Sequence, residues 1–151
     1  MKPKILLYSL VGLVVFYLLI YYNYYQAQQA IKNTRPSPLS VELVSYPESL
    51  SVGSSGTFIW HVQSSPDLST FYSTLYWGNQ SSPSALTKND SPQAVGYPSF
   101  VADYTDGRYR LPNDFDIKIK FNKIGKVYFR AYAKVGQEHL WSEENSLEVI
   151  K

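Results

Sequence analysis

Hydrophobic positions follow two different patterns along this chain. From Ile5 to Tyr22 they are almost continuous, with Ser9 and Gly12 as the only clearly non-apolar residues and with no charge. Roughly eighteen helical residues at about 1.5 Å each reach about 27 Å, close to the hydrocarbon thickness of a bilayer. This pattern predicts a transmembrane helix at residues 5–25, preceded by a short tail at residues 1–4.

Tyrosines mark the end of the apolar stretch. A phenol ring can stay in the apolar zone while its hydroxyl reaches headgroups and water, so tyrosine favours the membrane boundary. A cleaved secretory signal has a shorter apolar region of roughly 7 to 15 residues and then a small-x-small site, whereas Gln28 occupies one of the small positions here. We therefore expect a retained anchor whose membrane-interface residues are Tyr21, Tyr22, Tyr24 and Tyr25.

Flanking charges predict the orientation of this anchor. Lys2, Lys4 and the terminal amine precede the apolar stretch, and Lys32 and Arg35 follow it. A short basic tail ahead of a first helix favours a cytoplasmic N-terminus under the positive-inside rule. The predicted location is therefore a single-pass membrane protein with an extracytoplasmic C-terminal domain.

Beyond the anchor the period of the pattern changes. Residues 26–40 are interpreted as a polar helix extension and a linker, in which Pro36 and Pro38 favour extended backbone. From residue 41 to residue 151 apolar and polar positions alternate with a period of two, which is typical of strands with one face in a core. The clearest example runs from Phe115 to Asn122.

Turn residues separate the alternating runs, the longest such stretch being Gly78 to Gly96. About seven short strands without a helical segment predict a mainly β fold, an antiparallel β-sandwich. In immunoglobulin-like order, the expected strands are A at 41–46, B at 56–63, C at 70–77, D near 97–102, E at 115–121, F at 126–134 and G at 138–150.

Several segments of the sandwich region resemble immunoglobulin-like or fibronectin-III-like domains of archaeal and bacterial surface proteins. These segments are Tyr46-Pro47, Gly53, Phe58 to Val62, Tyr76 to Gly78, Gly96 to Ser99, Tyr128 to Ala131 and Trp141 to Glu144. The resemblance covers residues 40–150 and implies a Greek-key sandwich, a scaffold that serves many roles. Family members often carry histidine where this chain has Tyr72, Tyr76 and Tyr132, so no metal site is carried over.

Alternation places four tyrosines and one arginine on the outer face of the predicted C–F strand pair. Tyrosine and arginine are enriched at binding hot spots, although such side chains also stabilise a sheet through cross-strand pairs. If this face binds a partner, Arg130→Ala should leave folding intact and abolish association. The candidate binding residues, for an unidentified protein or glycan partner, are Tyr72, Tyr76, Tyr128, Arg130 and Tyr132.

Candidate catalytic and cofactor chemistry is sparse. The absence of cysteine excludes disulfides, thiolate metal sites and a cysteine nucleophile, and His61 and His139 have no matched partner in the sequence. The stretch Gly53 to Thr57 lacks the final glycine of a nucleophile elbow, and Asp103 to Gly107 reads as a turn rather than a calcium loop. We expect no enzymatic activity, no catalytic residues, no cofactor and no metal.

Charge and sequons change this picture little. Twelve basic and twelve acidic residues follow Ile31, so the region beyond the anchor is formally neutral. A neutral domain has no bulk attraction to nucleic acid, and we expect no nucleic-acid partner. The sequons at Asn79 and Asn89 are glycosylation acceptors only where the host has that machinery.

Two functions fit these observations. The first is a single-pass, membrane-anchored extracytoplasmic binding or assembly domain that contacts lipid through Ile5 to Tyr22 and serves as an accessory subunit of a membrane or surface complex. In that reading Gly12 and Ser9 offer a small-residue notch for another helix. The alternative is a pilin-like subunit of a surface filament or layer, although the short basic leader and the glutamate of type IV pilins are absent.

Overall fold

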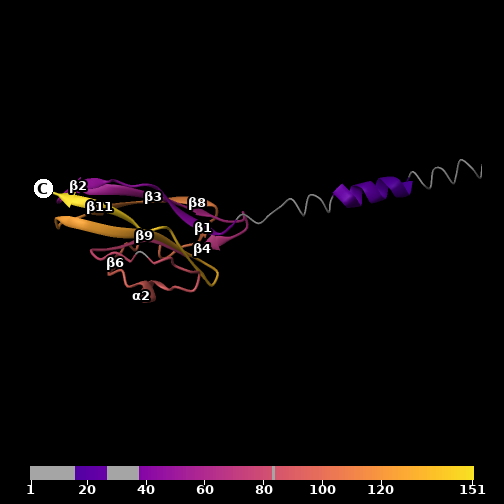
Figure 1. The fold of residues 1–151 in the computed structure, drawn as a ribbon. Coiled ribbons are helices and arrows are strands. Elements are labelled where there is room, and N and C mark those ends of the chain that lie inside the picture. The colour runs from indigo at the N-terminus through magenta and orange to yellow at the C-terminus, as the bar shows by residue number, and fades with distance from the viewer. Residues whose placement is uncertain (1–15, 27–37, 83) are drawn as a thin grey trace, which may run out of the picture. The chain divides into compact units, whose positions relative to one another are not determined.

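The computed structural model describes residues 16–26, 38–82 and 84–151. By contacts the chain divides into two compact units, Met1–Pro36 and Ser37–Lys151. The first unit contributes a helix and the second unit is mainly β (Figure 1).

The helix occupies residues 16–26 and includes the last part of the predicted apolar stretch. Its apolar and tyrosine side chains are between 51% and 67% exposed. Within the described ranges, no helix combines the length and the apolar character needed to cross a bilayer. Residues 1–15 and 27–37 lie outside the described residues, so the predicted tail, span and linker stay predictions. The four expected interface residues, Tyr21, Tyr22, Tyr24 and Tyr25, all belong to this exposed helix.

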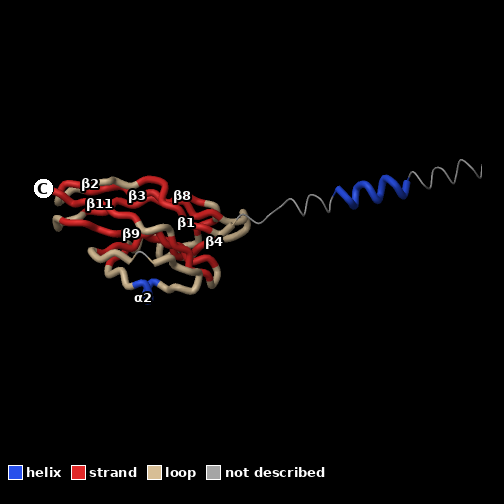
Figure 2. Tube along the Cα trace, viewed as in Figure 1, coloured by secondary structure: helices blue, strands red, loops and turns tan. Residues whose placement is uncertain are grey.

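The described residues of the second unit form eleven strands and one short helix, shown by type in Figure 2. In chain order they are β1 (Ser40–Ser45), β2 (Ser49–Ser51), β3 (Ser55–Gln63), β4 (Ser69–Thr70), β5 (Tyr72–Gly78), α2 (Pro92–Val95), β6 (Ser99–Phe100), β7 (Tyr109–Arg110), β8 (Asn113–Lys120), β9 (Gly125–Val135), β10 (Glu138–Trp141) and β11 (Asn145–Ile150).

These strands form two main sheets. One sheet has the order β1-β3-β8, and the other has the order β2-β11-β9-β5-β6 with β10 also paired to β9. The pairs are antiparallel except for the parallel pair of β2 and β11. With β1, β3 and β8 as strands A, B and E, and β5, β9 and β10–β11 as strands C, F and G, this is the strand order of an immunoglobulin-like sandwich. The predicted antiparallel, mainly β sandwich is confirmed.

Alternation along the strands explains the core between the sheets. In β8 the apolar residues Phe115, Ile117 and Ile119 are buried, whereas the residues between them are exposed. Trp60 of β3 is fully buried, stacks on Phe115 at 5.7 Å between ring centroids, and donates its Nε1 hydrogen to Ser73 Oγ at 2.8 Å. The ring stacking lies within the first sheet, and the hydrogen bond to Ser73 of β5 joins the two sheets.

The prediction of strand D near residues 97–102 is wrong. That region contains β6, which pairs with β5 in the second sheet and therefore lies beside strand C, not beside strand E. The reason is Thr74 of β5, whose hydroxyl bonds both the carbonyl oxygen of Val101 at 2.5 Å and its N–H at 3.3 Å. In the described part of the chain, no strand pairs with the outer edge of β8.

Candidate binding site

The five side chains predicted to form a binding face do lie on one face of the β5–β9 pair. Tyr76 is opposite Arg130 and Thr74 is opposite Tyr132, so these residues point away from the core between the sheets. The face is not open, however. Arg130 and Tyr132 are each 2% exposed and Tyr76 is 6% exposed, while Tyr72 and Tyr128 are half-buried. The expectation of a solvent-facing patch is therefore wrong, and binding by these residues stays a prediction.

A covering segment, residues 79–98 with residue 83 outside the description, accounts for this burial. Its Val95 and Tyr97 pack with Tyr76 and Tyr132 in a second, smaller core. The segment includes α2, and the carbonyl oxygen of its Asp90 accepts a hydrogen bond from Trp141 Nε1 at 2.8 Å. The outer face of the sheet is consequently a packed interior.

The tyrosine hydroxyls within this smaller core are paired. Tyr72 and Tyr76 share a hydrogen bond of 2.9 Å between their hydroxyls, and the Tyr132 hydroxyl lies 2.6 Å from Nδ1 of His139. Burial is the main cause that raises the pKa of Tyr76 and of Tyr132 well above that of an exposed phenol. The neighbouring Tyr72 raises the pKa further. Both phenols are neutral at physiological pH and act as hydrogen-bonding groups.

Arg130 fixes the covering segment to the sheet. Its guanidinium donates Nη1 to the carbonyl oxygen of Ser142 at 2.9 Å, and Nη2 to the carbonyl oxygens of Ser82 at 2.7 Å and Ser84 at 3.2 Å. A buried cation needs such partners because burial removes its hydration. Arg130 therefore holds this region together, and we no longer expect Arg130→Ala to leave folding intact.

Glu144 also holds the covering segment. Its carboxylate accepts hydrogen bonds from Ser81 Oγ at 2.5 Å, from the Ser82 N–H at 2.6 Å and from the Tyr97 hydroxyl. Burial alone would raise the pKa of Glu144, but these hydrogen bonds and the charge of Arg130 outweigh burial and hold the pKa below its usual value. Burial and the bond to this carboxylate raise the pKa of Tyr97 to about 12.

The lowered pKa of Glu144 predicts acid loosening of the covering segment. A carboxyl whose pKa is depressed by folding stabilises the folded state above its unfolded pKa, which is near 4.5, and that contribution disappears as the pH falls through the folded pKa. We expect the NMR amide signals of residues 79–98 to shift or broaden as the pH is lowered from 6 to about 3. In Glu144→Gln the same signals should be altered already at pH 6. Identical acid profiles in both proteins would contradict this role of Glu144.

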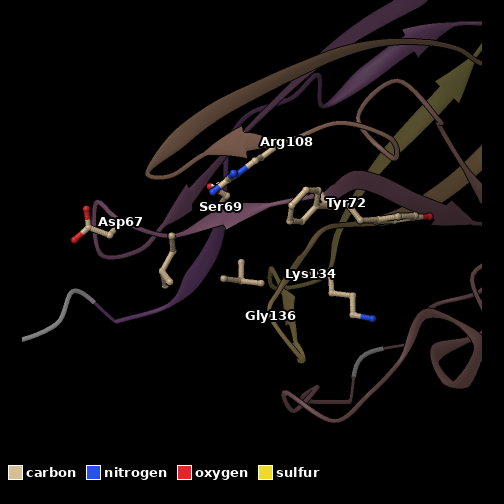
Figure 3. A pocket seen from close by; sticks show the side chains of 9 residues that line it. Asp67, Ser69, Tyr72, Arg108, Lys134 and Gly136 are labelled. Atoms are coloured by element: carbon tan, nitrogen blue, oxygen red, sulfur yellow. Dashed lines mark hydrogen bonds between the residues drawn. The ribbon is translucent and has the colours of Figure 1, made fainter.

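An open pocket of about 490 Å³ lies beside the smaller core, and we call it the end pocket. In Figure 3 Arg108 and Lys134 lie on opposite sides of it and Tyr72 lies between them. Phe71 is 61% exposed in this pocket, and Leu68 is 38% exposed. Of the five predicted residues, only Tyr72 lines it. Its other lining residues are Asp67, Ser69, Val135 and Gly136.

Phe71 lies in the predicted strand C at 70–77, where alternation with the outward Tyr72 predicts a core-facing side chain, but Phe71 is exposed. Thr70 is fully buried, and its hydroxyl bonds the carbonyl oxygens of Tyr72 at 2.9 Å and Lys134 at 2.8 Å. These side-chain bonds take the place of ladder hydrogen bonds at the break between β4 and β5, so the alternation is interrupted at Phe71. The only sequence signal for this is a threonine directly before the aromatic residue.

A smaller pocket of about 200 Å³ adjoins the tyrosine cluster. It shares Tyr72 and Lys134 with the end pocket and reaches Tyr76, Tyr132 and His139. Tyr72, Tyr76 and Tyr132 therefore line an open pocket at this margin of the described covering segment. The lining offers aromatic faces, hydroxyls and one ammonium group, which suits binding by stacking and hydrogen bonding.

Both histidines have partners. Nδ1 of His61 lies 2.6 Å from Asp114 Oδ1 and its Nε2 lies 3.1 Å from Gln63, and the hydrogen bond with Asp114 is the main cause that raises the pKa of His61. Among the described residues, no group of three or more His, Asp or Glu side chains is placed to hold a metal ion. The expected absence of enzymatic activity, cofactor and metal remains a prediction.

Comparison with known proteins gives few matches. No family model and no curated protein matches the sequence. Among solved structures, the chain is similar to the PKD domain of an M14-like peptidase from a Thermoplasmatales archaeon, with 13% identity, a TM-score of 0.49 and coverage of 78% of this chain and 98% of that one. It is also similar to the CARDB domain of a Pyrococcus furiosus protein, with 9% identity, a TM-score of 0.44 and coverage of 76% and 95%. The fold assignment rests on strand order and register.

Proposed function

We propose that this protein is a single-pass, membrane-anchored extracytoplasmic binding domain without enzymatic activity, an accessory subunit of a membrane or surface complex. The observation that carries the proposal is the helix at residues 16–26, whose apolar and tyrosine side chains are all at least half exposed. A helix that is apolar all round needs an apolar environment. The charge-free sequence upstream, from Ile5 onward, extends the same character to the length of a bilayer span.

The sandwich supports the binding part of this proposal. Its two sheets enclose one apolar core, and the described residues of that core all belong to the second unit. With the tyrosine face covered, the end pocket is a concave surface that presents the exposed side chains of Phe71, Arg108 and Lys134 beside the half-buried Tyr72. Aromatic and arginine side chains together are typical of binding hot spots.

Membrane extraction tests the anchor. The full chain should stay in the membrane pellet after washing with alkaline carbonate, whereas a variant without residues 1–31 should be released, because it lacks the apolar stretch. Protease added to intact cells should cleave the sandwich if it is extracytoplasmic. Extraction of the full chain by carbonate would contradict the anchor.

Peptide mapping separates this proposal from the filament alternative. A retained anchor predicts that the tryptic or chymotryptic peptides of the purified protein include the residues before Ile5. Pilin-like processing would instead remove N-terminal residues and place the protein in sheared surface filaments.

A further inference from the structure

The charge around the end pocket has the opposite sign to that of the sandwich as a whole. Residues 38–151 contain ten Lys and Arg and twelve Asp and Glu, so the sandwich is slightly acidic. The end pocket and the adjoining hollow of about 370 Å³ are lined by three cations, Arg108, Arg110 and Lys134, and by one carboxylate, that of Asp67. A cationic patch on an acidic domain indicates an anionic partner at that patch.

The three cations are available to such a partner. The ion pairs of the described residues are His61 with Asp114 and Lys88 with Glu138, and neither includes a cation of the end pocket. Among the described residues, Arg108 Nε bonds Ser69 Oγ at 3.5 Å and Arg110 Nε bonds the carbonyl oxygen of Pro66 at 3.4 Å. These long, neutral contacts orient the guanidinium groups without neutralising them.

Apolar side chains stand among these charges. Phe71 is 61% exposed and Leu68 is 38% exposed, and both line the end pocket. An exposed aromatic residue surrounded by Lys and Arg is the combination that binds the interface of an anionic bilayer, where the ring enters the headgroup layer and the cations meet phosphates.

The end pocket lies where the chain enters the sandwich. β1 begins at Ser40, which pairs with Gln63 at the end of β3, and the chain continues from there to Asp67 and Leu68 of the pocket. We call this end the β1 pole, and Figure 1 shows the start of β1 and β4 at one end of the sandwich and the C-terminus at the other. An N-terminal membrane anchor would tether the sandwich by the β1 pole, because Ser40 lies there.

We propose that the β1 pole docks on an anionic lipid surface, with Phe71 and Leu68 in the headgroup layer and Arg108, Arg110 and Lys134 on lipid phosphates. This inference rests on the proposed anchor and extends it, because the sandwich then lies on the membrane rather than only being tethered to it. Docking also orients the remainder of the sandwich, including the covering segment, for contact with a partner.

Site-specific fluorescence tests the docking on the full chain. The chain has no cysteine, so one introduced cysteine carries one dye. Gln137→Cys places the dye in the exposed turn beside the end pocket, and Asn122→Cys places it in an exposed turn at the opposite pole. The proteins are reconstituted in phosphatidylcholine vesicles with or without about a third phosphatidylglycerol, with a nitroxide on some headgroups.

Docking predicts quenching at one pole only. The dye at residue 137 should be quenched about threefold more strongly in the anionic vesicles than in the neutral ones, and about 1 M salt should remove the difference because the Debye length falls to about 3 Å. The dye at residue 122 should show no such difference. Phe71→Ser, and the double substitution Arg108→Gln with Arg110→Gln, should each reduce the quenching at residue 137 by at least about half.

A matched control uses the opposite pole, which has its own exposed apolar residue, Ile124, next to Lys123. Lys120→Gln with Lys123→Gln should leave the quenching at residue 137 unchanged. Equal quenching at both poles, or indifference to lipid charge in protein that resists carbonate extraction, would overturn the docking and leave the anchor intact. Loss of the protein from the vesicles on carbonate washing would overturn the anchor, and the docking with it.

Discussion

Arg130→Met is expected to lower the free energy of unfolding of the sandwich by about 3 to 5 kcal/mol, because it removes a buried cation that donates to three backbone carbonyl oxygens, and each buried acceptor left unsatisfied costs about 1 to 3 kcal/mol. The carbonyl oxygens of Ser82, Ser84 and Ser142 lose a charged donor, while Glu144 loses a nearby positive charge. Methionine keeps the unbranched shape of the side chain, so the change reports mainly on charge and hydrogen bonds. Urea denaturation followed by tryptophan fluorescence measures the effect.

Arg110→Met is the control for this experiment. Arg110 is exposed, and substitutions at such positions usually change stability by no more than about 0.5 kcal/mol. A loss of less than about 1 kcal/mol for Arg130→Met would show that the covering segment is held without Arg130. Any loss of partner binding in an Arg130 variant has to be read against this loss of stability.

Trp60→Ala is expected to cost about 3 to 5 kcal/mol, since it opens a large cavity in the core. Trp60 is fully buried, contacts the rings of Phe115 and Tyr104, and loses its hydrogen bond to Ser73 Oγ. A domain of this size has a total stability of roughly 5 to 15 kcal/mol, so the variant should be partly unfolded at modest urea concentrations. The measurement is again the urea midpoint and slope.

Ser73→Ala separates the hydrogen bond from the cavity. It leaves the indole in place and removes the hydroxyl, which accepts from Trp60 Nε1 and donates to the carbonyl oxygen of Tyr132 at 3.0 Å. It should therefore cost about 1 to 3 kcal/mol, less than Trp60→Ala. If the two substitutions had equal effects, the packing of Trp60 would contribute nothing beyond its hydrogen bond, and the role of the indole as the main core residue would be refuted.

The sequence predicts the sandwich well because its strands are half-buried. Where one face of a strand meets the core and the other meets water, every second residue must be apolar, as from Phe115 to Ile119 in β8. The same alternation correctly places Tyr76, Arg130 and Tyr132 on one face of the sheet. Their grouping was therefore predictable from the spacing of residues alone.

Alternation does not reveal what covers a face. The residues from Asn79 to Pro98 are mostly small and polar, so the pattern indicates a loop and says nothing about where it lies. Burial there depends on long-range bonds from Arg130 and Glu144, separated from their partners by more than forty residues. The available signals are Tyr97, an apolar ring in a polar loop, and an arginine amid buried aromatic residues.

Two threonines explain the other differences. Thr70 and Thr74 use their hydroxyls to bond backbone groups, and this turns Phe71 outward and draws Val101 to β5. Side-chain bonds of this type compete with ladder hydrogen bonds and leave no periodic trace in a sequence. For this reason the position of β6 and the exposure of Phe71 in the end pocket become evident only in the three-dimensional structure.

The first strands of the sandwich also determine how it responds to a mechanical load. β1 runs antiparallel to β3 in one sheet, and β2 then runs parallel to β11 in the other. A pull on Ser40 along the strand axis stretches the hydrogen bonds between β1 and β3 in shear, all together, instead of opening them one after another. The N-terminal end of the sandwich is thus the end at which tension is shared among many bonds, which suits a domain held by that end.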